Sequence, residues 1–361
     1  MSCDASSGSE IRVILVGVGY IGSEIAKTLL RKRGVRIVGA VDSSPEKAGK
    51  DLGDVIGIKE KMGIIVQRDI ADLNVSADIA IHATTSFLDE AYPQIVEIIK
   101  RGFNIISTCE ELSYPYIVNE DIAKAIDKLA KEHRVTVLGS GINPGFLMDT
   151  LVITLTAICQ DIKRIVAERI IDASKRRPSF QRKIGAGLSL EEFHEKFGKG
   201  ELVGHVGLKQ SIAMIANSIG IKLSGIREEP IKPIIAEEKV ESNFVTVKPG
   251  FVAGISQRAH GLIDNQPFIT LIFRAYVGAA WECDSIFIDG VPTINERITP
   301  CVNGDIGTAA IITNLIPRVI NAPPGLKTMK DMQALSAVLG DMGLFTNIRG
   351  SSSLRKRKRY I

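Results

Sequence analysis

The sequence predicts an α/β fold: an N-terminal Rossmann domain, which is a doubly wound parallel sheet, followed by a second α+β domain built on an open mixed sheet. An apolar run over 11–16 leads directly into a Gly-x-Gly-x-x-Gly turn and a helix start, as in the first unit of a dinucleotide-binding domain. Short apolar runs and amphipathic helices then alternate, as in a parallel sheet covered by helices. From Leu151 longer strand-like segments follow one another, which indicates a second domain.

The glycine turn predicts a cofactor. Gly17 permits the tight turn, Gly19 lets the backbone approach a pyrophosphate, and Gly22 lets the helix pack closely on the strand. The free N–H groups of the helix start would then face the phosphates. The second strand, 35–41, ends at Asp42, whose carboxylate would accept hydrogen bonds from an adenosine ribose. NAD or NADP is therefore the expected cofactor.

The choice between the two cofactors depends on the same carboxylate. Asp42 would repel a 2′-phosphate, so NAD is expected to be used at least as well as NADP. Ser43, Ser44 and Lys47 follow closely, and they would soften the preference.

The next elements continue the alternation, and they predict where ligands bind. Strands are expected over 63–66, 77–83, 103–107 and 135–138, with helices over 89–100 and 119–132. Ligands of such sheets lie beyond the carboxyl ends of the strands. The residues expected at the cofactor are accordingly Gly17, Gly19, Tyr20, Ile21, Gly22, Asp42, Ser43, Ala83, Thr84, Thr85, Cys109, Asn143 and Gly145.

Two carboxylates follow the fifth predicted strand, 103–107. Glu110 and Glu111 would lie where nicotinamide is expected if the adenosine lies over Asp42. A carboxylate there is a candidate for proton transfer, although the pair could also cap the next turn and face water. Glu110 is the first candidate, because it leaves the sheet first, and Glu111 is the second.

Substrate contacts are expected from two segments. The Asn-Pro-Gly turn after the last strand offers Asn143, Pro144 and Phe146, although such a turn also forms for purely local reasons. The cationic stretch 174–187 offers Arg177 or Lys183 for a substrate carboxylate, and the alternative is that the stretch is a solvated charge run. His82, at a strand end, is interpreted as a hydrogen-bonded structural histidine, with no stronger role for His194, His205 or His260.

The second half of the chain predicts a substrate and dimerisation domain, and the open sheet favours a symmetric homodimer. Strands are expected over 162–172, 231–237, 243–247, 266–277 and 285–288, and helices over 151–159, 190–196, 207–219 and 303–319. The expected division is a flexible N-terminus (1–10), the Rossmann domain (11–148), the substrate domain (149–302), a helical region returning to the Rossmann domain (303–345) and a basic flexible tail (346–361).

Composition narrows the class of protein. The chain of 361 residues has 45% hydrophobic and 24% charged residues and no long apolar run, as expected for a cytoplasmic globular protein without a membrane span or leader. Its five cysteines lie far apart with no metal-ligand spacing, so neither a disulfide nor a metal is expected. The five basic residues of the run 355–359 carry more positive charge than the whole chain's net charge of +4, so the rest of the chain is nearly neutral. We expect this run to be a solvated tail rather than a nucleic-acid contact.

Three motifs resemble a known family. The strings at 107–115 (STCEELSYP), 139–149 (GSGINPGFLMD) and 176–187 (RRPSFQRKIGAG), with Val41-Asp42 and 50–53, are similar to 2,4-diaminopentanoate dehydrogenase and the native amine dehydrogenases. The likeness covers roughly 11–330. These enzymes belong to the dihydrodipicolinate reductase-like group, but the reductase's own His-His-x-x-Lys-x-Asp-Ala-Pro-Ser-Gly stretch has no counterpart here, so that activity is not expected.

The resemblance implies NAD(P)-dependent oxidative deamination of an amine to a ketone and ammonia, and reductive amination in reverse. The family's glutamate of the Cys-Glu-Glu-Leu motif handles the ammonia and carbinolamine protons, and it corresponds to Glu110, with Glu111 as the second choice. The resemblance leaves the substrate open, with 2,4-diaminopentanoate or a related amino acid or amine as the candidates. Two other functions remain as alternatives: an imine or carbonyl reductase that needs no ammonia, and a nucleotide-sensing regulatory protein without turnover.

Overall fold

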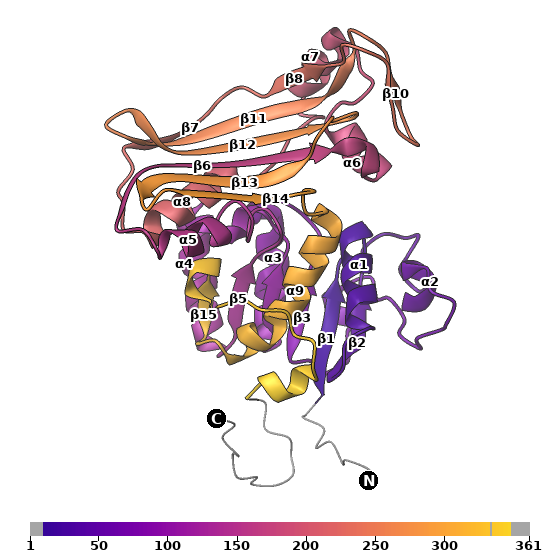
Figure 1. Cartoon of the computed structure of the whole chain (residues 1–361). Coiled ribbons are helices and arrows are strands. Elements are labelled where there is room, and N and C mark those ends of the chain that lie inside the picture. The colour runs from indigo at the N-terminus through magenta and orange to yellow at the C-terminus, as the bar shows by residue number, and fades with distance from the viewer. Residues whose placement is uncertain (1–9, 333, 348–361) are drawn as a thin grey trace, which may run out of the picture.

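The computed structural model describes residues 10–332 and 334–347, which form two domains, with the second sheet lying across one end of the first domain (Figure 1). Nearly all of the predicted basic tail (346–361) and of the predicted flexible N-terminus (1–10) lies outside these residues. Both predicted sheets are present, which confirms the fold class.

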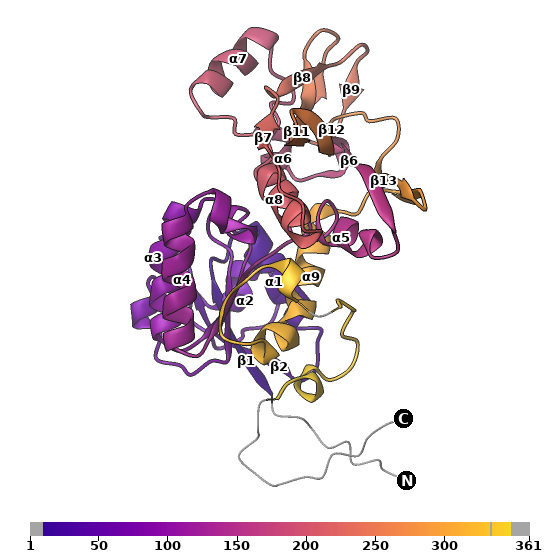
Figure 2. The ribbon, with the colours of Figure 1, turned by 90° about the vertical axis from the view of Figure 1, so that its left-hand side faces the viewer.

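The first domain is a six-stranded parallel sheet in the order β15-β5-β4-β3-β1-β2. Helices α3 and α4 cover one face, whereas α1 and α9 lie together on the other (Figure 2). The helix predicted over 303–319 thus runs back along the Rossmann domain, and β15 adds a strand to its sheet. The elements are β1 (Ile11–Val16), α1 (Tyr20–Leu29), β2 (Val35–Val41), α2 (Leu52–Ile56), β3 (Ile79–His82), α3 (Leu88–Lys100), β4 (Asn104–Ser107), α4 (Glu120–Glu132), β5 (Thr136–Gly139), α9 (Gly304–Asn321) and β15 (Gly325–Lys327).

The second domain contains a seven-stranded mixed sheet in the order β14-β13-β6-β12-β11-β7, with β8 also paired to β11. Only β12 and β6 run parallel; the other pairs are antiparallel. Its elements are α5 (Thr150–Thr156), β6 (Asp161–Asp172), α6 (Pro178–Lys183), α7 (Leu190–Gly198), α8 (Leu208–Ser218), β7 (Gly225–Glu228), β8 (Lys232–Ile235), β9 (Val240–Glu241), β10 (Thr246–Val247), β11 (Val252–Ile263), β12 (Gln266–Tyr276), β13 (Cys283–Val291) and β14 (Ile294–Ile298).

Several elements differ from the sequence prediction: α2, α6, β7, β14 and β15 were not predicted, and two other segments also differ. The run 63–66 is not a strand of the first sheet, because its backbone bonds to 49–52, and only the next residue, Gln67, joins the sheet through an isolated bridge to Val41. The long strand β11 was not predicted, since Gly254 and Gly261 interrupt its apolar pattern. Both glycines are required by close packing: a Cβ on Gly261 would lie 2.7 Å from the side chain of Ile212 on α8.

Candidate active site

Two cavities lie at the carboxyl ends of the Rossmann strands. One, of about 460 Å³, lies between the two domains and is lined by Glu110, Asn143 and second-domain residues; the other, of about 690 Å³, is lined by Asp42 and Arg68. Their linings share Gly19, Ala83 and Thr84. The two cavities therefore form one extended site around the glycine turn, as a dinucleotide requires.

The glycine turn has the predicted steric character. Gly17 has a φ of +89°, and a Cβ there would collide with the carbonyl oxygen of Ala83. A Cβ on Gly22 would collide with the carbonyl oxygen of Gly17, which keeps α1 close to the strand end. At Gly19, by contrast, an added Cβ would meet no protein atom within 4 Å. The backbone beside the start of α1 is thus open to a phosphate.

Asp42 ties the second strand end to the glycine turn. Its carboxylate accepts hydrogen bonds from Val18 N (2.8 Å), Ser44 N (3.0 Å) and Lys47 Nζ (2.9 Å). Burial opposes its ionisation, but the bonds from Lys47 and the two amides outweigh burial and lower the Asp42 pKa. Lys47 partly neutralises this carboxylate, and Arg68 adds a second cation to the same cavity. The cavity thus offers a ribose acceptor together with two cations suited to a phosphate.

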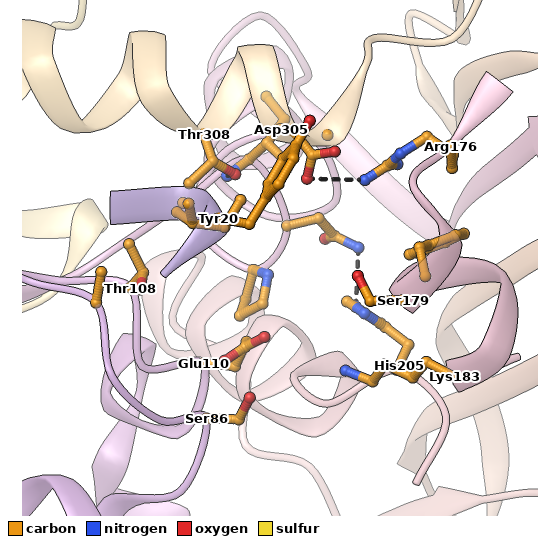
Figure 3. Close-up of a pocket in the computed structure, with 18 of the residues that line it drawn as sticks. Tyr20, Ser86, Thr108, Glu110, Arg176, Ser179, Lys183, His205, Asp305 and Thr308 are labelled. Atoms are coloured by element: carbon orange, nitrogen blue, oxygen red, sulfur yellow. Dashed lines mark hydrogen bonds and ion pairs between the residues drawn. The ribbon is translucent and has the colours of Figure 1, made fainter. Parts of the chain in front are cut away.

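Glu110 lies in the wall of the cavity between the domains, where β4 ends (Figure 3). Burial raises its pKa, and the nearby Lys183 ammonium and Ser86 hydroxyl offset part of that effect. Its backbone is fixed, because the hydroxyl of Ser113 donates to its carbonyl oxygen at 2.6 Å. A carboxyl group that is partly buried, cavity-facing and shifted toward neutrality is well suited to exchange a proton with a ligand.

Glu111, the second catalytic candidate, has a different place. Its Oε2 accepts a hydrogen bond from Leu88 N at 2.7 Å, so it caps the start of α3, and it does not line the cavity. The adjacent carboxylates therefore point in different directions, and their geometry favours Glu110 over Glu111 as the candidate for proton transfer.

The cavity holds four cations from the second domain, of which Arg177 and Lys183 were predicted to bind a substrate carboxylate. Arg176 and Arg177 both pair with Asp305 at the start of α9, Arg176 at 3.1 Å (Figure 3). The Arg177 guanidinium also lies 4.5 Å over the Tyr20 ring, so Arg177 links the two domains and is not a solvated loop charge.

Arg169 and Lys183 complete this cationic group. Arg169 is buried: its Nη1 forms an ion pair with Asp284 Oδ1 at 3.3 Å, without the geometry of a hydrogen bond, and its Nη2 donates to Val302 O. Lys183 lines the cavity from α6. Arg169 stands at an inward-facing position of β6, between Ala167 and Ile171, and this arginine within an apolar alternation was the sequence signal that could have identified it.

His205 is a cavity residue to which sequence analysis gave no role. Its ring stacks on Phe273 at 4.4 Å and 13°, and Nε2 lies 3.0 Å from Asn143 Nδ2. Burial lowers the pKa of His205 to about 3, with help from Lys183 and Arg169. The neutral ring therefore accepts from Asn143, whose Oδ1 is buried without a hydrogen-bond partner among the described residues. This orphaned acceptor is available to a ligand donor.

The predicted site residues divide into those that line one of the two cavities and those that do not. The cavities are lined by Gly17, Gly19, Tyr20, Ile21, Asp42, Ser43, Ala83, Thr84, Thr85, Glu110, Asn143, Pro144 and Arg177. The predicted residues outside these linings are Gly22, Cys109, Glu111, Gly145 and Phe146. Cys109 is buried and its thiol contacts Ser86 O, Gly145 is held by Asp149, and Phe146 packs on the second-domain core. These three residues lie outside the cavity linings and help to hold the lining residues in place.

Two negative findings concern residues 10–332 and 334–347. They contain no group of three His, Cys, Asp or Glu side chains arranged to hold a metal ion, and none of their helices is long and apolar enough to cross a bilayer.

Two family models and a known relative match this chain to dehydrogenase and reductase families. Residues 146–347 match the family model of the 2,4-diaminopentanoate dehydrogenase C-terminal domain, and 11–109 match that of the dihydrodipicolinate reductase N-terminus. The chain is 38% identical to 2,4-diaminopentanoate dehydrogenase of Acetoanaerobium sticklandii, over 92% of this chain and 96% of the relative.

Two solved structures also match this chain. An amine dehydrogenase from Mycobacterium smegmatis superimposes with a TM-score of 0.81 at 26% identity, over 92% of this chain and 98% of that one. GenD2 from gentamicin A biosynthesis, solved in complex with NAD, matches with a TM-score of 0.51 at 13% identity over 96% and 94% of the two chains, which shows a shared fold.

Proposed function

The chain belongs to the 2,4-diaminopentanoate dehydrogenase family and is an NAD(P)-dependent oxidoreductase; on this premise we propose that it deaminates an amine oxidatively to a ketone and ammonia, and aminates the ketone in reverse. The observation that carries the proposal is the partly buried carboxyl of Glu110, in a cavity that adjoins the glycine turn. The bound nicotinamide supplies the position that accepts or returns the hydride.

Glu110 supplies the proton chemistry in this proposal. A carbon bearing an ammonium group cannot release hydride until the nitrogen has lost a proton, so deamination requires a base within the cavity. In the amination direction the same carboxyl returns a proton as the carbinolamine loses water. The raised pKa suits both directions. A carboxylate with a higher pKa is a stronger base, and its protonated form persists to higher pH, where it can act as an acid. Glu111 has no part in this chemistry, since its carboxylate caps α3.

The charges of the cavity favour a substrate with a carboxylate. Arg176 and Arg177 share the single carboxylate of Asp305, whereas Arg169 is already paired with Asp284. An added anion would balance this excess of positive charge and accept forked hydrogen bonds from a guanidinium. We therefore propose an amino acid with a second amino group, such as 2,4-diaminopentanoate, in preference to a simple alkyl amine. Asn143 Oδ1 is a further acceptor that suits an ammonium or amine group.

A panel of amines and ketones, with and without ammonium and followed by NAD(P)H absorbance, tests the proposal. We expect NAD(P)H formation from a diamino acid, and NAD(P)H consumption with its keto product only when ammonium is present. Consumption without ammonium would support a carbonyl or imine reductase instead. Cofactor binding with no turnover on any substrate would support a regulatory protein.

A homodimer is proposed as the working assembly. Helix α8 packs on one face of the second-domain sheet, whereas no helix in the described part of the chain covers the opposite face (Figure 2). That face carries Val166, Ile272 and Phe287, all partly exposed, beside the Arg274–Glu168 ion pair. Such a mixed surface can pair with a second copy about a two-fold axis. Light scattering should give twice the mass of one chain, and a monomer at micromolar concentration would contradict the proposal. A cytoplasmic location also stays a prediction.

A further inference from the structure

A chain of hydrogen bonds runs beneath the strand ends from the Asp42 cavity to the turn that carries Glu110. It begins at Gln94 on α3, which lines the Asp42 cavity. Gln94 Oε1 lies 3.1 Å from His82 Nε2, His82 Nδ1 lies 2.7 Å from the Ser107 hydroxyl, and Cys109 N lies 3.1 Å from the same hydroxyl oxygen. His82 and Ser107 are both fully buried.

The donors and acceptors in this chain can be arranged in only one direction. Gln94 Oε1 can only accept, because its amide nitrogen donates to Glu90 O, so His82 carries its proton on Nε2. Nδ1 must then accept from the Ser107 hydroxyl, whose oxygen in turn accepts from Cys109 N. Thr84 Oγ1, 2.8 Å from Nε2, is a second acceptor for the same proton. The arrangement requires a neutral ring, and burial lowers the pKa of His82 to about 4.

The last bond acts on the residue before Glu110. Cys109 N is buried at the point where the chain leaves β4, and Ser107 Oγ is its acceptor. On the other side of Glu110, Ser113 holds the carbonyl oxygen and Ser86 O accepts from Glu111 N at 3.2 Å. The backbone on both sides of Glu110 is thus fixed by buried hydrogen bonds, and Ser107 supplies the one that depends on the ring of His82.

We infer that His82 and Ser107 are positioning residues for the proton-transfer chemistry: through Cys109 N they set where the Glu110 carboxyl meets the substrate nitrogen. This inference rests on the proposed function of Glu110. A misplacement of about 1 Å can lower turnover by about 10²-fold even when the change lies away from the reacting atoms. His82 thereby has a role beyond the satisfied structural histidine that its sequence position predicted.

Two substitutions at His82 test the roles of its two ring nitrogens separately. The amide of His82→Asn reaches the position of Nδ1 and can still accept from Ser107, whereas that of His82→Gln reaches only toward Nε2 and Gln94. We expect His82→Asn to keep kcat within about 3-fold of the wild type. We expect His82→Gln and Ser107→Ala to lower kcat by about 10- to 100-fold, with the KM for the amine and the cofactor Kd, measured by fluorescence, changed less than 3-fold. Equal losses in the two His82 variants would overturn the inference.

A double-mutant cycle with Glu110→Gln gives the decisive test. If Ser107 acts through Glu110, Ser107→Ala should cause no further loss in the residual turnover of Glu110→Gln. Thr136→Val is the matched control, since it removes a buried hydroxyl from β5 of the same sheet that bonds to Ala322 O, and it should leave kcat unchanged. Additive losses in the cycle, or a loss in the control equal to that of Ser107→Ala, would make Ser107 merely structural.

The cycle also distinguishes the two possible failures. Near-normal turnover in Glu110→Gln would refute the proposed role of Glu110 and this inference with it. A large loss in Glu110→Gln combined with additive losses would refute the inference alone.

Discussion

Replacing Glu110 with glutamine removes the proton acceptor while it preserves the size of the side chain and its capacity for hydrogen bonds. The amide has the size and shape of the carboxyl, and the carboxyl is partly buried with a raised pKa, so loss of its charge should not destabilise the fold. Acid–base catalysis by a positioned side chain contributes about 10²–10⁴-fold. We therefore expect Glu110→Gln to lower kcat by that factor in both directions, with unfolding temperature and cofactor Kd close to those of the wild type.

The pH profile gives an independent check of the same variant. Deamination needs the ionised carboxylate, so the wild-type kcat/KM should fall as the pH decreases through the Glu110 pKa. Burial raises that pKa, so the fall should occur above the range of an ordinary glutamate, and it should be absent from the residual activity of Glu110→Gln. NAD(P)H absorbance measures both quantities. Glu111→Gln, which retains an oxygen to accept from Leu88 N, is the matched control and should retain nearly full turnover. Near-normal turnover in Glu110→Gln would refute the reasoning.

Three further predictions concern the cofactor, the substrate and stability. Asp42→Ala should raise the ratio of NADP to NAD efficiency, because it removes the ribose acceptor and releases Lys47 for a 2′-phosphate; an unchanged ratio would exclude Asp42 from the ribose site. Arg177→Met should weaken a carboxylate-bearing substrate by about 2–5 kcal/mol and leave an alkyl amine nearly unaffected, as measured by kcat/KM; equal losses would mean that its contacts to Asp305 and Tyr20 only hold the domains together. Stability in urea should decrease as the pH drops from 6.5 toward 4, because the unfolded chain binds protons that the buried, neutral His82 and His205 do not. The His82 shift alone, to about 4, corresponds to about 3 kcal/mol, and an unfolding free energy constant over this range would contradict the assignment.

The sequence was sufficient to predict those parts of the site that depend on local order. The glycine turn, Asp42 and Glu110 each follow directly from a strand end, and parallel strands bring their carboxyl ends to one edge of the sheet. Adjacent residues are less certain, because Glu110 and Glu111 lie in a short 3-10 turn, where each residue rotates the side-chain direction by about a third of a turn. Glu110 faces the cavity, whereas Glu111 caps α3.

The second-domain contribution to the site depends on contacts between distant segments. His205 lies in a loop before α8 and reaches the cavity through its stacking on Phe273 and its bond to Asn143. Arg176 and Arg177 meet Asp305 across more than 120 residues of sequence. No local pattern encodes such pairings. The positions of single residues, such as Arg169 within an apolar strand, were the only available signals.

The stoichiometry of a single reaction tests the central claim most directly. The purified protein would be incubated with NAD or NADP and 2,4-diaminopentanoate, and the ammonia released would be compared with the NAD(P)H formed. Oxidative deamination predicts equal amounts of the two products, and both should fall together in Glu110→Gln. NAD(P)H formation without ammonia would contradict the account, as would a protein that binds the cofactor and forms neither product from any amine.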